Sequence, residues 1–272
     1  RCLDGTRYVP VELLDVAGLV PGAHEGRGLG NQFLDELTNA DAILNVLDAS
    51  GSTNAEGEPV EEGSHDPVED VEFIEAEMNQ WLTGIIDRNW ESVERKSRSP
   101  DFDINDALTD LMTGFGATTA DVAACLRALD YPEDPIQWTD ADREALASEV
   151  RARTKPIILV ANKADIADEE TLQRLEDAAE IVIPATADGE LALRRGVEAG
   201  VVDYKPGDAD FEITGDLSDS QQAGLEQIRD VMNEYGGTGV QRALNAAVYD
   251  LLDHLTAYPV QNETKWTDGQ GN

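Results

Sequence analysis

The most constraining feature of this chain is a short apolar run that ends in polar residues. Residues 156–161 read Pro-Ile-Ile-Leu-Val-Ala, and they are followed directly by Asn-Lys-Ala-Asp at 162–165. A β-branched run of this length, bounded by Pro and by polar residues, is typical of a buried strand. In an open α/β sheet, ligands bind at the carboxyl ends of the strands, where these polar residues would lie. The pattern therefore predicts an α/β fold with a ligand site after residue 161.

The last residue of this motif, Asp165, has the chemistry to select one nucleobase. An ionised carboxylate only accepts hydrogen bonds, and it can take two parallel N–H bonds from the edge of a guanine ring. Adenine does not offer this pair of donors. Charge-assisted bonds of this kind contribute about 1.5–3 kcal/mol each. The string Asn-Lys-x-Asp is common in itself, so its place after a strand is what favours a guanine site.

A second motif of the same kind lies near the amino terminus. Asp4-Gly5 predicts a hairpin turn, and residues 6–14 suit a strand that ends at Asp15. An Asp at this position can hold a water molecule of a Mg²⁺ shell, since Mg²⁺ keeps several waters. Gly18 would let a backbone amide approach a terminal phosphate. An ordinary turn after a strand is the alternative, but a phosphate-type motif followed by a base-type motif favours a nucleotide site.

Six segments carry a pattern that is more specific than either motif. They are residues 15–31, which are rich in glycine, and residues 48–53, 162–165, 190–195, 204–208 and 258–260. Together they resemble the Obg-like GTPases of the YchF type, in particular the archaeal branch. The resemblance implies an α/β, P-loop NTPase-type G domain that binds GTP and Mg²⁺ and hydrolyses GTP slowly.

The resemblance also assigns roles to individual residues. Asn162, Lys163 and Asp165 would recognise and frame the base. Thr186 and Ala187 follow a strand predicted over 180–184, and they correspond to a Ser-Ala loop whose amide contacts the guanine carbonyl. Thr186 replaces the usual Ser, which leaves a backbone contact possible. In the phosphate region, Gly18 would sense the γ-phosphate and Asp15 would hold the metal through water.

The group that positions the attacking water is not identified by the sequence. Small GTPases of the Ras type place a Gln directly after the Gly of this motif, and here that position is Leu19, which cannot hydrogen-bond to water. The γ-phosphate itself, a cation or a partner would have to do so. His24 is the nearest titratable candidate, and a mobile surface histidine is the alternative. We therefore assign no catalytic residue.

The loop that cradles phosphates in such sites is absent from this sequence. No G-x-x-x-x-G-K-[S/T] pattern occurs in the 272 residues. The chain opens on Arg1 within the hairpin that precedes Asp15, and residues 267–272 resemble the beginning of the small TGS module of this family. We expect an internal fragment, with an incomplete G domain that lacks its first strand and P-loop. By this interpretation the longer parent is the GTPase, and the fragment alone is inactive.

The spacing of the two motifs predicts an insertion. One strand–helix–strand crossover needs about 30 residues, far fewer than separate Asp15 from Asn162. Apolar residues recur at helical spacing over 68–85 and 104–115, which indicates an inserted helical hairpin or coiled-coil arm. The basic stretch 94–100 would form its tip, either as an RNA contact or as a solvated loop. The expected division is a G domain over 1–65 and 154–257, a helical insert over 66–153 and the start of a TGS-like module over 258–272.

The remaining elements follow from periodicity and capping signals. We predict strands over 42–47, 180–184 and 255–260, helices over 33–39, 169–179, 188–199, 221–235 and 240–252, and a surface loop over 204–215.

The charge balance limits where the protein works and what it binds. The chain has 56 acidic against 20 basic residues, a formal charge of −36, and the acids are spread along the sequence. This pattern indicates adaptation to a salt-rich cytoplasm, because screening relieves the self-repulsion. A basic partner would instead favour one concentrated acidic patch. The charge opposes non-specific nucleic-acid binding, and we expect no sequence-specific DNA binding.

Other classes of function are disfavoured by the same sequence. No apolar stretch approaches the ~20 residues of a membrane span, and the 2 cysteines fit a reducing cytosol. The family resemblance suggests a ribosome or translation-linked partner. The alternative is a ribosome-binding interaction module with a vestigial or ATP-preferring nucleotide site, and the intact Asp165 favours GTP.

Overall fold

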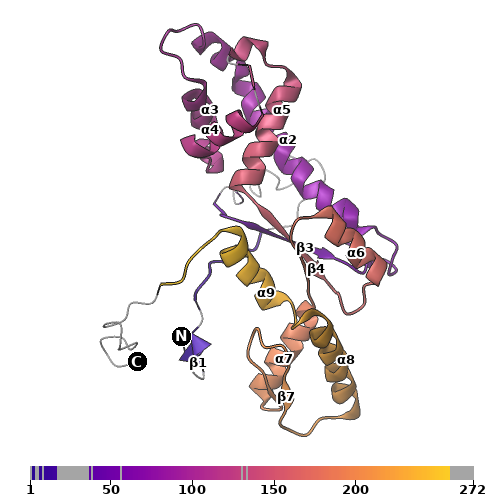
Figure 1. The fold of residues 1–272 in the computed structure, drawn as a ribbon. Helices are drawn as coiled ribbons and strands as arrows, with labels where there is room; N and C mark the ends of the chain where they lie inside the picture. Colours follow the sequence, from indigo (N-terminus) through magenta and orange to yellow (C-terminus); the bar gives the residue numbers. More distant parts are fainter. Residues whose placement is uncertain are drawn as a thin grey trace, which may run out of the picture.

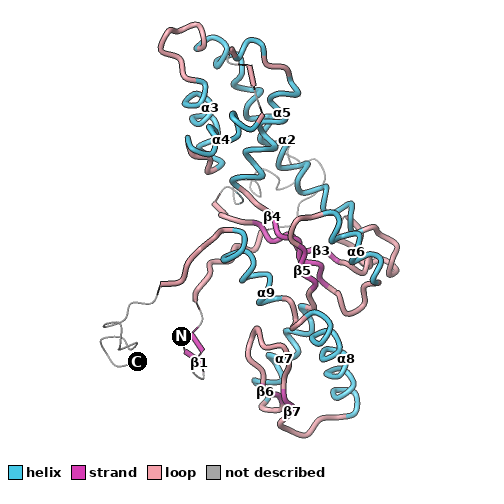
Figure 2. Tube along the Cα trace, in the orientation of Figure 1, coloured by secondary structure: helices cyan, strands magenta, loops and turns pink. Residues whose placement is uncertain are grey.

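The protein has a central parallel sheet with a helical arm on one side and a smaller lobe on the other (Figure 1). The computed structural model describes residues 2–3, 6–7, 9–16, 37, 39–55, 57–129, 131–132 and 134–257. Helices and strands alternate through the central region (Figure 2). The predicted α/β class with an inserted helical arm is confirmed.

The sheet consists of three described strands that all run in the same direction. They are β3 (Ile43–Asp48), β4 (Ile157–Asn162) and β5 (Val182–Pro184), in the order β3-β4-β5. The register of β3 on β4 runs from Ile43 opposite Ile157 to Asp48 opposite Asn162. The two strands therefore end side by side, and the polar residues that follow them share one edge of the sheet.

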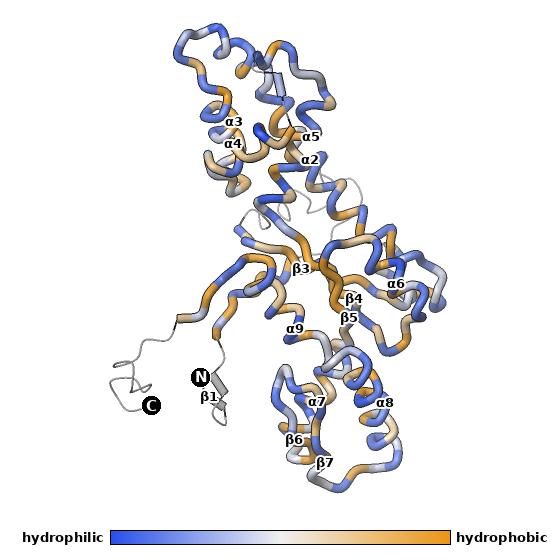
Figure 3. Tube along the Cα trace, in the orientation of Figure 1, coloured by the Kyte–Doolittle hydropathy of each residue, from blue (hydrophilic) through white to orange (hydrophobic). Residues whose placement is uncertain are grey.

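Strand β4 is buried on both faces, which explains why its sequence is continuously apolar rather than alternating. Leu159 and Ala161 pack on one face with residues of α6 (Glu169–Ala178) and with Val71. Ile158 and Val160 pack on the opposite face against α9 (Val240–Asn245) and the π-helical turn η4 (Ala246–Leu251). Figure 3 shows the resulting apolar centre at β3 and β4.

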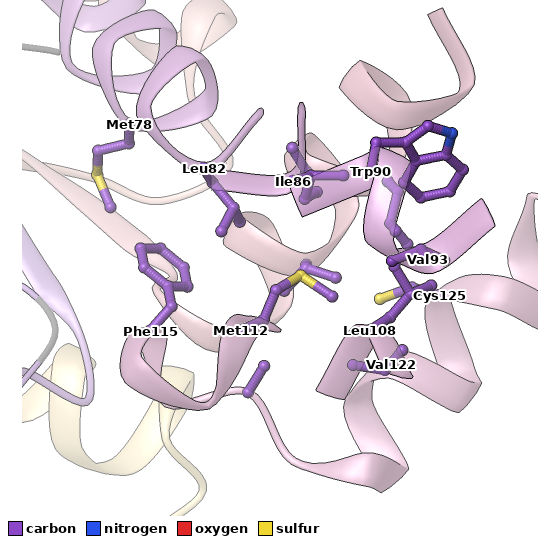
Figure 4. Packing of buried hydrophobic residues seen from close by; sticks show 14 of the residues in the cluster. Met78, Leu82, Ile86, Trp90, Val93, Leu108, Met112, Phe115, Val122 and Cys125 are labelled. Carbon is purple, nitrogen blue, oxygen red and sulfur yellow. The ribbon is translucent and has the colours of Figure 1, made fainter. Parts of the chain in front are cut away.

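The arm is built from the chain between β3 and β4. Its helices are α2 (Pro67–Lys96), α3 (Ile104–Met112), α4 (Thr119–Ala128) and α5 (Asp140–Thr154), with short 3₁₀ turns η2 (Thr113–Phe115) and η3 (Pro135–Gln137). Met78, Leu82 and Ile86 form the fully buried stripe of α2. They lie close to α3 and η2 (Figure 4). The helices predicted over 68–85 and 104–115 are confirmed, and the basic stretch 94–100 spans the end of α2 and the following loop.

Helix termini in the arm follow the capping rules that the sequence contains. Asp66 caps α2, with Pro67 at its first position. Thr118 and Thr139 form reciprocal capping boxes at the starts of α4 and α5. Among the described residues, none of the helices combines the length and apolarity that a bilayer crossing requires.

The smaller lobe follows β5. It contains α7 (Ala187–Ala199), β6 (Val202–Asp203), β7 (Glu212–Ile213) and α8 (Asp219–Tyr235). The prediction of a surface loop over 204–215 is wrong in part, because Tyr204 and Phe211 are only 5% and 3% exposed. They anchor the segment in a core with Leu193 and Met232. The richness of this segment in Gly, Pro and Asp obscured its two buried aromatic side chains.

The amino-terminal segment differs from its prediction. The hairpin is confirmed, since β1 (Cys2–Leu3) pairs antiparallel with β2 (Thr6–Arg7). The strand predicted up to residue 14 is wrong beyond β2, because residues 9–16 have no regular secondary structure. A strand requires a partner, and this segment pairs with none of the described strands.

Two further predictions fall partly on residues that are not described. Of the helix predicted over 33–39, only Leu37 and Asn39 are described. Of the strand predicted over 255–260, only residues 255–257 are described, and they have no regular structure, with Leu255 92% exposed. The predicted module over 258–272 lies outside the described residues. The helices predicted over 169–179, 188–199 and 221–235 are confirmed, and that over 240–252 forms α9 and η4.

Candidate functional site

The loops that follow the three strands are joined into one rim by backbone hydrogen bonds. The Ala49 amide donates to the Asn162 carbonyl at 2.9 Å, and the Ala185 amide donates to the Ala161 carbonyl at 2.9 Å. In return, the Ala164 amide donates to the Ala185 carbonyl at 3.0 Å. The motif at 162–165 therefore stands on a backbone that is held from both neighbouring strands.

Asn162 links the end of β4 to the start of α7. Its Oδ1 accepts a hydrogen bond from the Ala187 amide at 3.0 Å. The resemblance assigns that amide to the guanine carbonyl, so a bound base would have to share it with Asn162 or displace it. Because Oδ1 faces Ala187, the Nδ2 group of Asn162 is left as the donor for a ligand.

Lys163 is held in an unusual backbone conformation by its side chain. Its φ angle is 61°, in the left-handed region that non-glycine residues rarely adopt. Its Nζ donates to Asp48 Oδ2 at 2.6 Å and to Ser52 Oγ at 2.8 Å, and it lies 3.4 Å from Thr53 Oγ1. The ammonium group is thus fixed at the loop after β3, and the stem of Lys163 is fixed with it.

Asp48 is the centre of this cluster. Its carboxylate accepts hydrogen bonds from the hydroxyls of Ser50, Ser52 and Thr53 at 2.6 to 2.8 Å, in addition to the bond from Lys163. Burial by itself would raise the pKa of Asp48, but the hydrogen bonds from Lys163 and the three hydroxyls outweigh it. The pKa of Asp48 is therefore held well below its usual value.

Asp165 is the second carboxylate of the rim, and it differs from Asp48 in its exposure and in its lack of protein partners among the described residues. It is exposed, and within the described part of the chain it has no hydrogen bond or ion pair. Asn162 Oδ1 and Lys163 Nζ are engaged with protein, whereas the carboxylate of Asp165 is an acceptor that is available to a ligand. An open hollow of about 640 Å³ lies on the side of Lys163 that faces the loop after β3, and it is lined by Lys163, Ser52, Thr53, Glu61 and Glu62.

Thr186 occupies the position after β5 that the sequence predicted, and it begins α7. It is only 2% exposed. Its Oγ1 accepts the Gly189 amide at 3.2 Å, which caps the helix, and its own amide donates to the Thr238 carbonyl at 2.9 Å. The structure thus brings Asn162, Lys163, Asp165, Thr186 and Ala187 together at one edge of the sheet.

Asp15 is not part of this group. It lies in the extended segment 9–16, exposed, and no contact among the described residues joins it to the rim. Its neighbour Val16 packs in the cluster that contains Leu37 and Ile43, the first residue of β3. Asp48 and Asn162 lie at the other end of the strands. Gly18, Leu19 and His24 lie outside the described residues.

The donor set that the described residues offer to a metal is small. They contain no group of three or more His, Cys, Asp or Glu side chains able to hold an ion. Mg²⁺ needs only one or two carboxylates when phosphates and waters complete its shell. The free carboxylate of Asp15 fits that requirement as one ligand, and its role remains a prediction.

The sequence reasoning assigned no role to the residues that fix Lys163. The ammonium group of Lys163 contacts Asp48, Ser52 and Thr53. The sequence predicted only that the segment 48–53 resembles the family, without a role for these side chains. The signal was present, because Asp48 directly follows the strand predicted before the insertion. Strands that are parallel neighbours bring their terminal residues together.

Comparison with known proteins identifies the family. A Methanocaldococcus jannaschii protein, described as the uncharacterized GTP-binding protein MJ1332, is 44% identical over 275 residues, covering 100% of this chain and 69% of that protein. The chain belongs to the Obg-like GTP-binding protein family. A family model for the G4 motif-containing domain of YGR210-like Obg-like GTPases matches residues 160–262 of this Obg-like protein. That match begins two residues before Asn162 and includes the two loops of the rim that follow β4 and β5, from Asn162 to Ala187.

Two further relatives of this Obg-like protein agree. A Schizosaccharomyces pombe protein, the uncharacterized GTP-binding protein C428.15, is 33% identical over 274 residues, 96% of this chain and 66% of its own length. The crystal structure of a GTP-binding protein from Pyrococcus horikoshii matches with a TM-score of 0.71 and 36% identity, covering 85% of this chain and 63% of that chain. The chain thus spans about two thirds of the length of these relatives.

A more distant relative carries a different description. The Bacillus subtilis protein named ribosome-binding ATPase YchF is 26% identical over 201 residues, which is 69% of this chain and 51% of that protein. The Obg-like family therefore includes proteins named for GTP binding and proteins named as ATPases.

Proposed function

We propose that the rim formed by β3, β4 and β5 binds a guanine nucleotide, and that the complete protein hydrolyses GTP with Mg²⁺. The observation that carries the proposal is Asp165, an exposed carboxylate without a protein partner among the described residues. It follows β4, in the same loop as Lys163, whose ammonium group is engaged with Asp48. The descriptions of the relatives as GTP-binding proteins support the same assignment.

Each side chain of the rim has a distinct task in this proposal. Asp165 accepts the two N–H groups of the guanine edge, and Asn162 donates from Nδ2 to a purine ring nitrogen. Lys163 frames the base with its stem, since its ammonium group is fixed by Asp48. Ala187 presents its amide to the guanine carbonyl, shared with or released from Asn162, and Thr186 holds this loop in place through its amide bond to Thr238. Recognition therefore depends on a preorganised backbone rather than on mobile side chains.

The phosphate side of the proposal concerns the complete protein. Bound Mg²⁺ would neutralise charge on the phosphates. Asp15 would hold it through water, and Gly18 would sense the γ-phosphate. His24 is a weak candidate for positioning the attacking water, and Leu19 offers no hydrogen bond for that purpose. Phosphate binding also requires a Lys-bearing glycine loop, which the 272 residues do not contain.

We further propose a cytoplasmic protein that works with the ribosome or with translation factors. The name of the B. subtilis relative supports a ribosomal partner. The formal charge of −36 supports a salt-rich cytoplasm. The division into a split G domain, a helical insert over 66–153 and a TGS-like module from residue 258 belongs to the same proposal.

The second candidate is a ribosome-binding module whose nucleotide site is vestigial or prefers ATP. The observation in its favour is that a relative is named an ATPase. Absence of turnover by the complete protein, even with ribosomes in molar KCl, would support it. An ATP preference would leave Asp165 without a function in base recognition.

The deciding experiment is calorimetric titration of the complete protein with GTP and with ATP at molar KCl. We expect GTP to bind at least about 100-fold more tightly, because two charge-assisted hydrogen bonds distinguish the two bases. Equal affinity for the two nucleotides would contradict the guanine assignment. Tighter binding of ATP would support the second candidate.

A further inference from the structure

The smaller lobe contains a buried carboxylate that the proposed chemistry does not use. Glu190 lies in the first turns of α7 and is only 5% exposed. Its two oxygens accept three hydrogen bonds, from Tyr204 Oη at 2.7 Å, from Thr238 Oγ1 at 2.6 Å and from Arg194 Nε at 2.6 Å. A charged group that is both buried and fully satisfied fixes the segments that supply its donors.

The charge state of Glu190 is set by these donors. Burial by itself would raise the pKa of Glu190, but hydrogen bonds from Thr238, Tyr204 and Arg194 outweigh it and lower the pKa. Burial, followed by the bond to Glu190, raises the pKa of Tyr204 to about 12. Glu190 therefore remains an acceptor and Tyr204 a donor throughout the neutral range.

The donor that matters most is Thr238, because it connects Glu190 to the base-recognition loop. Thr238 is 3% exposed, and its carbonyl accepts the Thr186 amide at 2.9 Å. Its side chain is held by Glu190 while its backbone holds Thr186. The residue directly after Thr186 is Ala187, whose amide donates to Asn162 Oδ1.

The next residue, Gly239, shows how closely this turn approaches the rim. Its φ angle is 83°, and a Cβ atom at this position would lie 2.1 Å from the Pro184 carbonyl oxygen and 2.7 Å from Ala185 Cα. Only glycine permits this approach. The turn at 238–239 is therefore packed directly on the backbone at the end of β5.

We infer that Glu190 is a positioning residue for base recognition, which holds the turn at Thr238 and, through it, the loop at Thr186 and Ala187. This inference rests on the proposed function, since it concerns the place where the guanine carbonyl would be read. Glu190 does not touch the base. It acts by fixing the distance between the amides at the start of α7 and the carboxylate of Asp165.

The test compares Glu190→Gln with Glu198→Gln in the complete protein. The first change keeps the shape of the side chain but turns an amide group toward one of the three donors. The second makes the same chemical change at an exposed position of the same helix. Three ligands are titrated: GTP, 6-thio-GTP, in which sulfur weakens the acceptor at the carbonyl position, and ITP, which lacks the amino group that faces Asp165.

We expect Glu190→Gln to narrow the preference for GTP over 6-thio-GTP by about fivefold to tenfold, which corresponds to loss of one well-placed hydrogen bond. The preference for GTP over ITP should stay the same, because it reports on Asp165. Glu198→Gln should change neither ratio. A merely structural role would lower the melting temperature of the Glu190 variant and leave both ratios unchanged, and that result would overturn the inference.

A second variant keeps the test decisive if Glu190→Gln does not fold. Tyr204→Phe removes one of the three donors and leaves the carboxylate of Glu190 in place. It should narrow the preference for GTP over 6-thio-GTP by a smaller factor than Glu190→Gln does. An unchanged ratio there would also overturn the inference. Failure of the proposed function looks different, because the wild-type protein itself would then show no preference for GTP over ATP or ITP, and both proposals would fall together.

Discussion

The rim after β4 and the segment 9–16 each contain residues for which the sequence predicts a function. They differ in how the surrounding protein holds them. At the rim, backbone hydrogen bonds join three strand ends, and Lys163 and Asn162 are fixed by protein partners. In the segment, Leu13 and Leu14 are 63% and 52% exposed and no strand pairs with them among the described residues. The proposed base-recognition loops are therefore held by residues within this chain, whereas the proposed phosphate side has no comparable support in the described part.

The sheet shows the same contrast between its strands. Strand β4 is covered on both faces, but Val46 of β3 is 59% exposed on the face where α9 and η4 cover only part of the strand. An open hollow of about 630 Å³ lies beside it, lined by residues 9–14, by the start of β3 and by η4. Strand β4, which precedes the proposed base-recognition loop, is thus more completely buried than β3.

The contrast between the rim and the segment 9–16 is tested most strongly by Asp165→Asn in the complete protein. An amide cannot accept both guanine N–H groups, because its NH₂ group meets a donor, so GTP affinity should fall by about 100-fold or more. Calorimetric titration measures the change. Asp177→Asn removes a charge from the exposed face of α6 and should leave the affinity unchanged. A fall of less than about threefold for the Asp165 variant would place base recognition elsewhere.

Gly239→Ala tests how tightly the turn is packed on the rim. The added methyl group would overlap the Pro184 carbonyl oxygen, and alanine would also have to adopt the left-handed backbone conformation of Gly239. The free energy of unfolding should therefore fall by about 2 kcal/mol. The control is Gly224→Ala in α8, where nothing lies within 4 Å of an added Cβ. That change should be neutral or stabilising by up to about 1 kcal/mol. Equal effects of the two substitutions in denaturant unfolding would show that the turn is not packed on the rim.

Asp48→Asn tests the bracing of Lys163 and has a defined pH dependence. Since the pKa of Asp48 is lowered in the folded protein, its contribution to stability is present above the ordinary Asp pKa of about 3.9 and is lost as the pH falls toward the folded-state pKa. We expect the variant to lose about 1 kcal/mol at pH 7, because Lys163 is partly exposed. The difference from wild type should shrink in acid. Parallel stability curves between pH 7 and pH 3 would contradict this account.

The smallest effect is expected on the open side. Leu13→Ser changes a side chain that is 63% exposed, so the free energy of unfolding of the 272-residue chain should change by no more than about 0.5 kcal/mol. Leu159→Ala, at a position 1% exposed in β4, should cost about 2–5 kcal/mol in the same assay. A loss above about 1 kcal/mol for Leu13→Ser would show that the segment is packed in solution.

Periodicity and capping signals predicted the elements that are stabilised locally. The burial of β4, the apolar stripe of α2 and the capping box at Ser218 are all visible in short stretches of sequence. The strand predicted over 6–14 was wrong over 9–14, because a strand depends on a partner, which composition does not reveal. Asp48 and Glu190 were missed as functional side chains for a related reason. Their partners, Lys163 and Thr238, lie 115 and 48 residues away in the chain.

The origin of the arm has a mechanical consequence. Helix α2 is 30 residues long and begins at Pro67, after the loop that follows β3, the strand whose last residue, Asp48, binds Lys163. A helix of that length extends about 45 Å, so a tilt of about 5° at its base displaces its far end by about 4 Å. By this geometry, a small change in the direction of α2 at its base would become a displacement of several ångströms at its far end.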